Sequence, residues 1–162
     1  MSEDYGKRIK RAANLMSRSM DAYAARYGLT GTQMSIIDFL GESQNRTQRD
    51  IEIEFDIRPS TTTKILQRME ASGLLTARRD PKDGRQRIIA PTAKARGMQT
   101  AARAYIEDQQ KAMERRFDQR ELAAFDRVLA YFIALNSDDA SQTGKEPRPC
   151  EPRSKARQSP AR

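Results

Sequence analysis

The sequence of 162 residues contains no histidine, no tryptophan and a single cysteine, Cys150. Without histidine, Ser-His-Asp and Cys-His catalysis are excluded, as are metal sites built on imidazole. The acidic residues mostly alternate with basic ones along helix faces, and no convergent pair of carboxylates stands out. We therefore expect no enzyme activity, no metal and no cofactor. Cys150 has neither a partner cysteine nor a cationic pocket nearby in the sequence, so we expect an exposed thiol without a role.

Long apolar runs are also missing from the chain. No stretch approaches the roughly 18 residues that indicate a membrane span, and the N-terminal segment MSEDYGKRIK lacks the apolar core of a secretory signal. These absences predict a cytoplasmic protein without a membrane partner. The composition, 37% hydrophobic and 32% charged, is typical of one helical domain that is large enough to bury a core.

What the chain does have is positive charge in one place. The segment from Arg58 to Arg103 carries 11 Lys and Arg against 3 Asp and Glu, whereas the rest of the sequence holds 19 of each sign and is neutral. The whole net charge of +8 thus falls on about a quarter of the chain. Such a concentration is typical of a surface that binds the phosphates of nucleic acid.

Helical periodicity is strong before and after this basic segment. Residues from about 2 to 27 predict one long helix that ends at Gly28, and Thr30 with Gln33 forms a capping box that opens the next helix. After Thr92 the pattern predicts a fifth helix to about Arg116 and a sixth that begins at Asp118. The first helix carries an apolar stripe at Ile9, Ala13, Met16, Met20, Tyr23 and Tyr27. The sixth is expected to turn Leu122, Phe125, Val128, Leu129, Phe132 and Ile133 inward.

The basic segment itself is predicted to form a winged helix-turn-helix. Thr47 and Asp50 begin a short third helix, Asp56 lies at a tight turn, and a fourth helix runs from Pro59 to Gly73. Two short strands, 74–79 and 87–90, then enclose a run of turn-forming residues. The expected fold is therefore mainly α with a small β-hairpin wing.

The fourth helix has one apolar and one polar face. Thr62, Ile65, Leu66 and Met69 cluster on one side, while the other side presents hydroxyls, an amide and cations. These polar groups suit hydrogen bonds to phosphates and base edges. The alternative is an ordinary solvated face, but Glu70 is the only acid between Arg58 and Arg79. The predicted DNA-binding residues are Arg58, Ser60, Thr61, Thr63, Lys64, Gln67, Arg68, Arg78, Asp83, Arg85 and Arg87.

Three segments resemble the MarR family of winged helix-turn-helix transcriptional regulators. They are GLTGTQ at Gly28–Gln33, RPSTTTKILQRMEASGLL at Arg58–Leu75 and DPKDGRQRIIAPT at Asp80–Thr92, which is similar to the family's wing. The resemblance implies a homodimer on a palindromic operator, with the fourth helix in the major groove and Arg85 in the minor groove. It also implies repression and a role for Asp83 in orienting Arg85. Gly84 departs from the family pattern, which commonly has Arg there.

The resemblance further implies release by a small ligand, with aromatic compounds as the candidates. The candidate pocket residues, which could equally be plain core, are Met16, Met20, Tyr23, Tyr27, Met34 and Phe39. The alternative is a winged-helix regulator that has no ligand pocket and acts through protein partners. RNA binding is disfavoured because the segment from Arg58 to Arg103 contains no aromatic residue on which bases could stack.

The predicted domain organisation follows from these elements. Residues 1–136 form a single MarR-like domain, with the winged helix-turn-helix at about 30–92 and dimerisation helices at about 2–27 and 93–136. Residues 137–162 hold four of the seven prolines and almost no apolar side chains. Such a segment cannot bury enough surface to offset its ordering entropy, so we expect a disordered basic tail.

Overall fold

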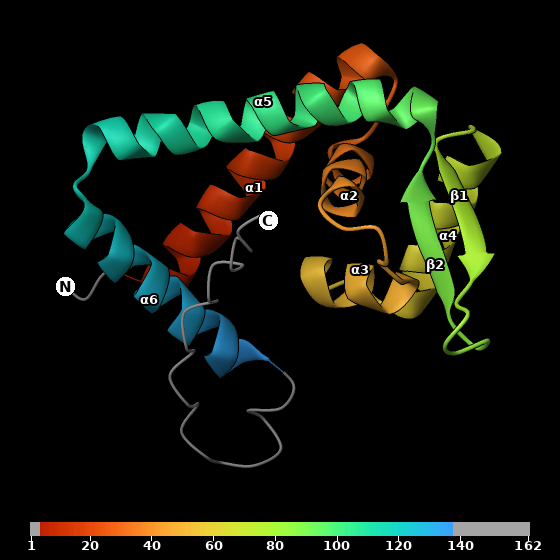
Figure 1. Ribbon diagram of the computed structural model, residues 1–162. Coiled ribbons are helices and arrows are strands. Elements are labelled where there is room, and N and C mark those ends of the chain that lie inside the picture. The colour runs from red at the N-terminus through yellow and green to blue at the C-terminus, as the bar shows by residue number, and fades with distance from the viewer. Residues whose placement is uncertain (1–3, 138–162) are drawn as a thin grey trace, which may run out of the picture. The chain divides into compact units, whose positions relative to one another are not determined.

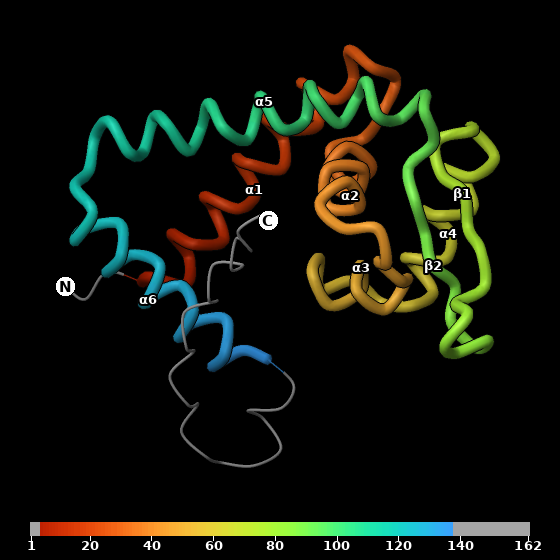
Figure 2. The backbone as a smooth tube through the Cα atoms, in the orientation of Figure 1, coloured from red at the N-terminus to blue at the C-terminus, as the bar shows by residue number. Residues whose placement is uncertain are grey.

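The computed structural model of the protein describes residues 4–137. The elements in chain order are α1 (Tyr5–Ala24), a 3₁₀ turn η1 (Ala25–Tyr27), α2 (Gly31–Gly41), α3 (Gln48–Phe55), α4 (Pro59–Ala71), β1 (Leu75–Arg79), β2 (Arg87–Pro91), α5 (Ala93–Arg116) and α6 (Gln119–Asn136). Figures 1 and 2 show their course. The predicted fold class, mainly helical with one antiparallel hairpin, is confirmed.

The helix boundaries are determined locally by capping residues. Complete capping boxes open α2 at Thr30, α3 at Thr47 and α6 at Asp118, so that the first free amides of each helix are satisfied. Gly28 and Gly73 both adopt φ of 70°, the left-handed conformation that ends a helix. These predicted starts and stops are confirmed.

α2 is the central helix of the core. Met34, Ile36 and Ile37 on this helix are fully buried, and their neighbours Phe39 and Leu40 are nearly so. Apolar side chains of α3, α4, the hairpin and α5 join the same cluster. Because α2 is buried on almost every side, the surrounding helices and strands can present their polar faces to solvent.

The hairpin is antiparallel, with Leu75 opposite Pro91 and Arg79 opposite Arg87. The segment before α3 extends it: the amide of Ile89 donates to the carbonyl oxygen of Arg46 at 2.8 Å, and Thr47 bridges to Ile88. The start of α3 is therefore tied directly to the wing.

α1 and α5 meet through tyrosines within the part of the chain up to Asp108. The rings of Tyr23 and Tyr105 stack with centroids 4.6 Å apart, and the Tyr23 hydroxyl donates to the carbonyl oxygen of Ala101 at 3.2 Å. Nearer the N-terminus the predicted stripe of α1 is only partly covered: Met16 is 60% exposed and Ala13 is exposed, whereas Ile9 is half-buried. The stripe packs on the core only near its C-terminal end, at Met20 and Tyr23.

Contacts divide the chain into two compact units, Met1–Asp108 and Gln109–Arg162. α6 lies in the second unit, and the prediction that its apolar face turns inward is wrong for Phe125, Val128 and Ile133, which are 53%, 59% and 68% exposed. The periodicity of α6 correctly predicted an amphipathic helix. Periodicity alone does not tell whether the covering surface belongs to the same chain or to another one.

Two further observations concern the described residues as a set. Between residues 4 and 137, no helix is both long and apolar enough to cross a membrane. The same residues contain no group of three acidic, histidine or cysteine side chains that could hold a metal ion. Cys150 and the predicted tail from residue 138 onward lie outside the described residues.

Candidate nucleic-acid interface

The turn between α3 and α4 is built from local chemistry. α3 ends at Phe55, and Asp56 adopts the left-handed conformation with φ 48° and ψ 49°. Asp tolerates this region better than most residues because its short polar side chain causes little crowding. Pro59 then begins α4, at a position where its missing N–H costs nothing. This turn sets the direction in which α4 leaves α3.

α4 has the two predicted faces. Thr62, Leu66 and Met69 are buried, and the Thr62 hydroxyl is satisfied by the carbonyl oxygen of Arg58 at 3.1 Å. The opposite face is open to solvent and carries small hydroxyls, an amide and two cations. Its exposed residues are Ser60, Thr61, Lys64, Gln67 and Arg68.

Thr63 is one member of the predicted set whose side chain is bonded within the fold. It is half-buried, and its hydroxyl donates to the carbonyl oxygen of Pro59 at 2.9 Å and accepts from Nε2 of Gln48 at 3.0 Å. Gln48 also donates to Oε1 of Glu52 at 2.9 Å. A hydroxyl has one donor, which is used here, so Thr63 fixes α4 against α3. Gln48 was missed from the sequence, where nothing marks a contact across 15 residues.

The acids of the hairpin tip fold its backbone. The carboxylate of Asp83 accepts from the Arg85 amide at 3.0 Å and from the Gln86 side chain at 3.3 Å. Asp80 accepts from the amide of Lys82 at 2.8 Å. Asp83 thus holds the backbone of Arg85, while the guanidinium remains exposed at the tip.

Arg87 is the predicted contact whose charge is partly compensated. Its guanidinium lies 3.3 Å from Oε1 of Glu70, which ties the loop end of the two strands to the end of α4. By contrast, several cations of α4 and the hairpin form no ion pair with any residue between 4 and 137. They are Arg58, Lys64, Arg68, Arg78, Arg79, Lys82 and Arg85.

The electrostatic result is a surface with available positive charge. Glu70 is paired, and Asp80 and Asp83 are bonded to backbone amides. The acidic side chains in this region are therefore bonded within the fold, whereas most of the basic side chains are exposed to water. A polyanion with regularly spaced charges is the ligand that such a surface attracts.

A second ionic cluster joins α2 and its C-terminal end to α5. Arg103 lies 3.1 Å from Oδ1 of Asp38 and donates to Oε1 of Glu42 at 2.8 Å. Burial raises the pKa of Asp38 above its ordinary value, and the Arg103 charge opposes that rise. The hydrogen bond that Arg103 donates to Glu42 is the main cause of the raised pKa of Arg103. More than 60 residues separate these partners in the chain, so no sequence pattern pointed to them.

The predicted effector-pocket residues have mixed environments. Met34 is fully buried, and Phe39 packs edge-on against Phe55 with centroids 5.7 Å apart. Met20 and Tyr23 border the same core, whereas Met16 and Tyr27 are 60% and 38% exposed. Neither of the two cavities beside the hairpin is lined by any of the six. Their role in ligand binding stays a prediction.

A short helix, a tight turn, a second helix with a polar outer face and a basic hairpin together define a winged helix-turn-helix protein. The sequence profile of the MarR family matches residues 27–86. The chain is 39% identical to the transcription regulator MarR from Oenococcus oeni PSU-1; the match covers 80% of this chain and 98% of that one, with a TM-score of 0.72. The chain belongs to the MarR family, whose members are transcription regulators and not enzymes.

More distant structures share the fold. S. aureus MepR in its DNA-binding conformation is 17% identical, with a TM-score of 0.78 over 83% of this chain and 100% of that one. The S. aureus MepR–DNA complex is 16% identical, with a TM-score of 0.73 over 84% and 100%. At these identities the likeness concerns the fold alone. No protein of curated function matches the chain.

Proposed function

We propose that the chain is a cytoplasmic, homodimeric repressor that binds a palindromic DNA operator. The observation that carries the proposal is the set of cations on α4 and the hairpin that form no ion pair within residues 4–137, where the nearby acids are already bonded. The exposed face of α4 enters the major groove, and Arg85 at the hairpin tip enters the minor groove, where negative potential concentrates. The family membership and the MepR–DNA complex support this arrangement.

The predicted contact residues divide into two roles. Ser60, Thr61, Lys64, Gln67 and Arg68 offer groups to bases and phosphates, and Arg58, Arg78 and Arg85 offer phosphate or groove contacts. Thr63, Asp83 and Arg87 act one step back, because their polar groups already hold α4 or the hairpin in place. Positioning of this kind lowers the ordering cost of binding.

The uncovered apolar side chains support the proposed dimer. Phe125, Val128 and Ile133 on α6 and Met16 on α1 are more than half exposed in the single chain. A two-fold partner that covers them would present two α4 helices to successive major grooves about one helical turn apart. Control of the dimer by a small ligand stays a prediction from the sequence.

The experiment is a titration of a duplex, selected from a random pool by binding to the protein, at several salt concentrations. Neutralising roughly 6–10 phosphates per dimer gives a slope of log affinity against log salt of about −5 to −10. Single-stranded RNA serves as the competitor. A flat salt dependence, or preference for the RNA, would contradict the proposal.

Replacement of the tip cation tests the minor-groove assignment. Arg85→Ala should weaken operator binding by about 1–3 kcal/mol, the usual size of a specific contact, and leave the melting temperature unchanged. Arg11→Ala, at an exposed cation of α1, is the matched control for the loss of one positive charge. Equal affinities of the two variants would remove Arg85 from the interface.

A further inference from the structure

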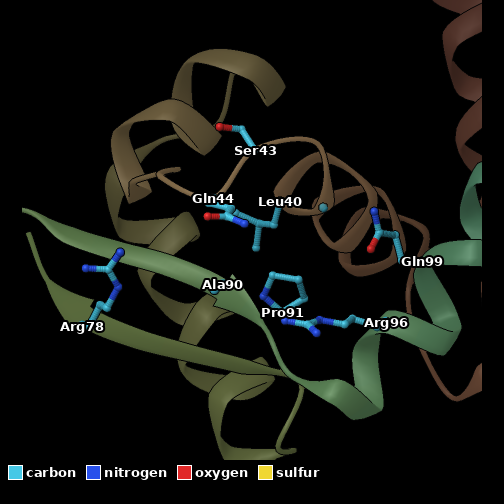
Figure 3. A pocket seen from close by; sticks show the side chains of 9 residues that line it. Leu40, Ser43, Gln44, Arg78, Ala90, Pro91, Arg96 and Gln99 are labelled. Atoms are coloured by element: carbon cyan, nitrogen blue, oxygen red, sulfur yellow. The ribbon is translucent and has the colours of Figure 1, made fainter. Parts of the chain in front are cut away.

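A cavity of about 460 Å³ lies beside the hairpin, within the first unit of the chain. Its walls come from the end of α2 and the loop after it, from both strands and from the first turns of α5. Figure 3 shows Arg78 and Arg96 on the two sides of Ala90 and Pro91, with Gln44 and Leu40 facing them. The volume is within the range of sites for small molecules.

Two of the strand residues that line the cavity, Arg78 and Ala90, lie on the face of the hairpin opposite Arg87. Arg87 pairs with Glu70 of α4, and its cross-strand partner Arg79 shares that side. Side chains alternate along a strand, so Arg78 and Ala90 stand on the opposite side. Pro91, at the end of β2, lies on the same face as Arg87, so the cavity extends around the end of the strand.

The lining has the chemistry of an anion site with an apolar wall. Arg78 and Arg96 each bring a guanidinium that forms no ion pair within residues 4–137, and none of the lining residues is acidic. Ser43, Gln44 and Gln99 supply hydrogen-bonding groups, and Leu40 with Pro91 supplies apolar surface. Two separated guanidinium groups suit two carboxylates joined by a small carbon skeleton.

Gly41 has no side chain, and this leaves room for the side chain of Gln99 at the edge of the cavity. The amide of Gln99 occupies the space that a Cβ on Gly41 would need. A glycine at this place allows α5 to approach α2 closely, and it aims a hydrogen-bonding group at the cavity. The polar lining is thus built by close packing between two helices.

We propose that this cavity binds a small organic dicarboxylate, which competes with DNA for Arg78. Arg78 lines the cavity and also belongs to the residues assigned above to DNA, so the competition rests on the proposed function. A ligand that engages Arg78 removes one cation from the DNA-binding surface. By reciprocity, DNA lowers the affinity for the ligand by the same factor.

The binding step is tested by calorimetry on the full chain with isophthalate and glutarate, and with isophthalamide as the neutral counterpart. At least one dianion should bind and the diamide should not. Arg96→Gln should weaken dianion binding about tenfold to a hundredfold, as expected for loss of a charge-assisted contact. Arg79→Gln, the neighbouring arginine on the opposite side of the hairpin, is the matched control and should retain binding.

The competition step is tested by titrating duplex with and without a saturating dianion. The dissociation constant for DNA should rise severalfold in the native chain and stay constant in Arg96→Gln. Absence of dianion binding, equal binding by the two variants, or an unshifted DNA affinity would overturn the proposal. Weak DNA binding by Arg96→Gln without ligand would also overturn it, because the cavity would then serve the phosphate backbone. If the native chain binds no duplex, the proposed function is wrong. Calorimetry then still decides whether the cavity binds the dianion.

Discussion

The region around α2 and the helix α6 are both rich in apolar side chains, yet they bury these side chains very differently. The 16 buried apolar residues found within residues 4–137 all fall between Ala24 and Ala102. On α6 no residue is buried, although the helix is capped and apolar on one side. The first region completes its core inside one chain, whereas Phe125, Val128 and Ile133 on α6 are more than half exposed in the single chain.

The largest expected effect comes from the core. Met69→Ala should lower the free energy of unfolding by about 2–5 kcal/mol, because the fully buried side chain leaves a cavity. Urea denaturation measures the loss. Met16→Ala is the control of the same residue type, exposed by 60% in the single chain, and should cost far less. Equal losses in the free energy of unfolding would contradict the expected difference between the buried and the exposed methionine.

The next effect concerns α6 and the proposed dimer. Ile133→Ser should weaken association by about 1–3 kcal/mol per interface, as for an apolar anchor, and shift the sedimenting species toward monomer. Ile53→Ser is a closely matched control, since Ile53 on α3 is 67% exposed against 68% for Ile133. A dimer that tolerates Ile133→Ser but not Ile53→Ser would place the interface elsewhere.

A smaller effect should follow from releasing the hairpin from α4. Glu70→Gln frees Arg87 from its ion pair, and a freed guanidinium that engages one phosphate steepens the salt dependence of DNA binding by about 0.9. The cost in stability should stay below about 1 kcal/mol because the pair is largely exposed. Glu54→Gln removes the same charge from exposed α3 without breaking a pair. An identical slope of the salt dependence in both variants would show that the released Arg87 does not engage a phosphate.

The smallest effect is confined to the pH dependence of stability. Burial raises the pKa of Asp38 above 3.8, so the folded chain holds this proton more tightly than the unfolded chain does. The associated stability is fully present below 3.8 and is lost as pH rises through the raised pKa. An asparagine side chain does not titrate in this range, so the Asp38→Asn variant lacks this pH-dependent loss of stability. The wild-type free energy of unfolding, measured by urea titration from pH 3.5 to 7, should therefore fall relative to the variant as pH increases, and a constant difference would refute it.

The elements of the fold were predictable because their signals are local. Each capping box, at Thr30, Thr47 and Asp118, closes through hydrogen bonds within three residues. The turn at Asp56 and the helix end at Gly73 likewise depend on the conformation of one residue. Helical periodicity also assigned the buried face of α4 correctly.

The candidate site was predictable only in part. Residue type and period identified the exposed groups of α4, but they also assigned Thr63 to that face, where its hydroxyl is already bonded to Gln48 and Pro59. The ion pair between Arg87 and Glu70 crosses 17 residues and leaves no trace in the local pattern. Residue type alone shows which groups a surface has, and the partners show which remain available.

The order of helices and strands, the caps and the concentration of positive charge follow from the linear sequence alone, because each of these depends on neighbours along the chain. Tertiary structure decided which of those charges are compensated, which of the predicted pocket residues are core, and that Arg78 meets Arg96 across a cavity. These outcomes depend on contacts between segments tens of residues apart, and such contacts exist only once the core around α2 has brought the segments together.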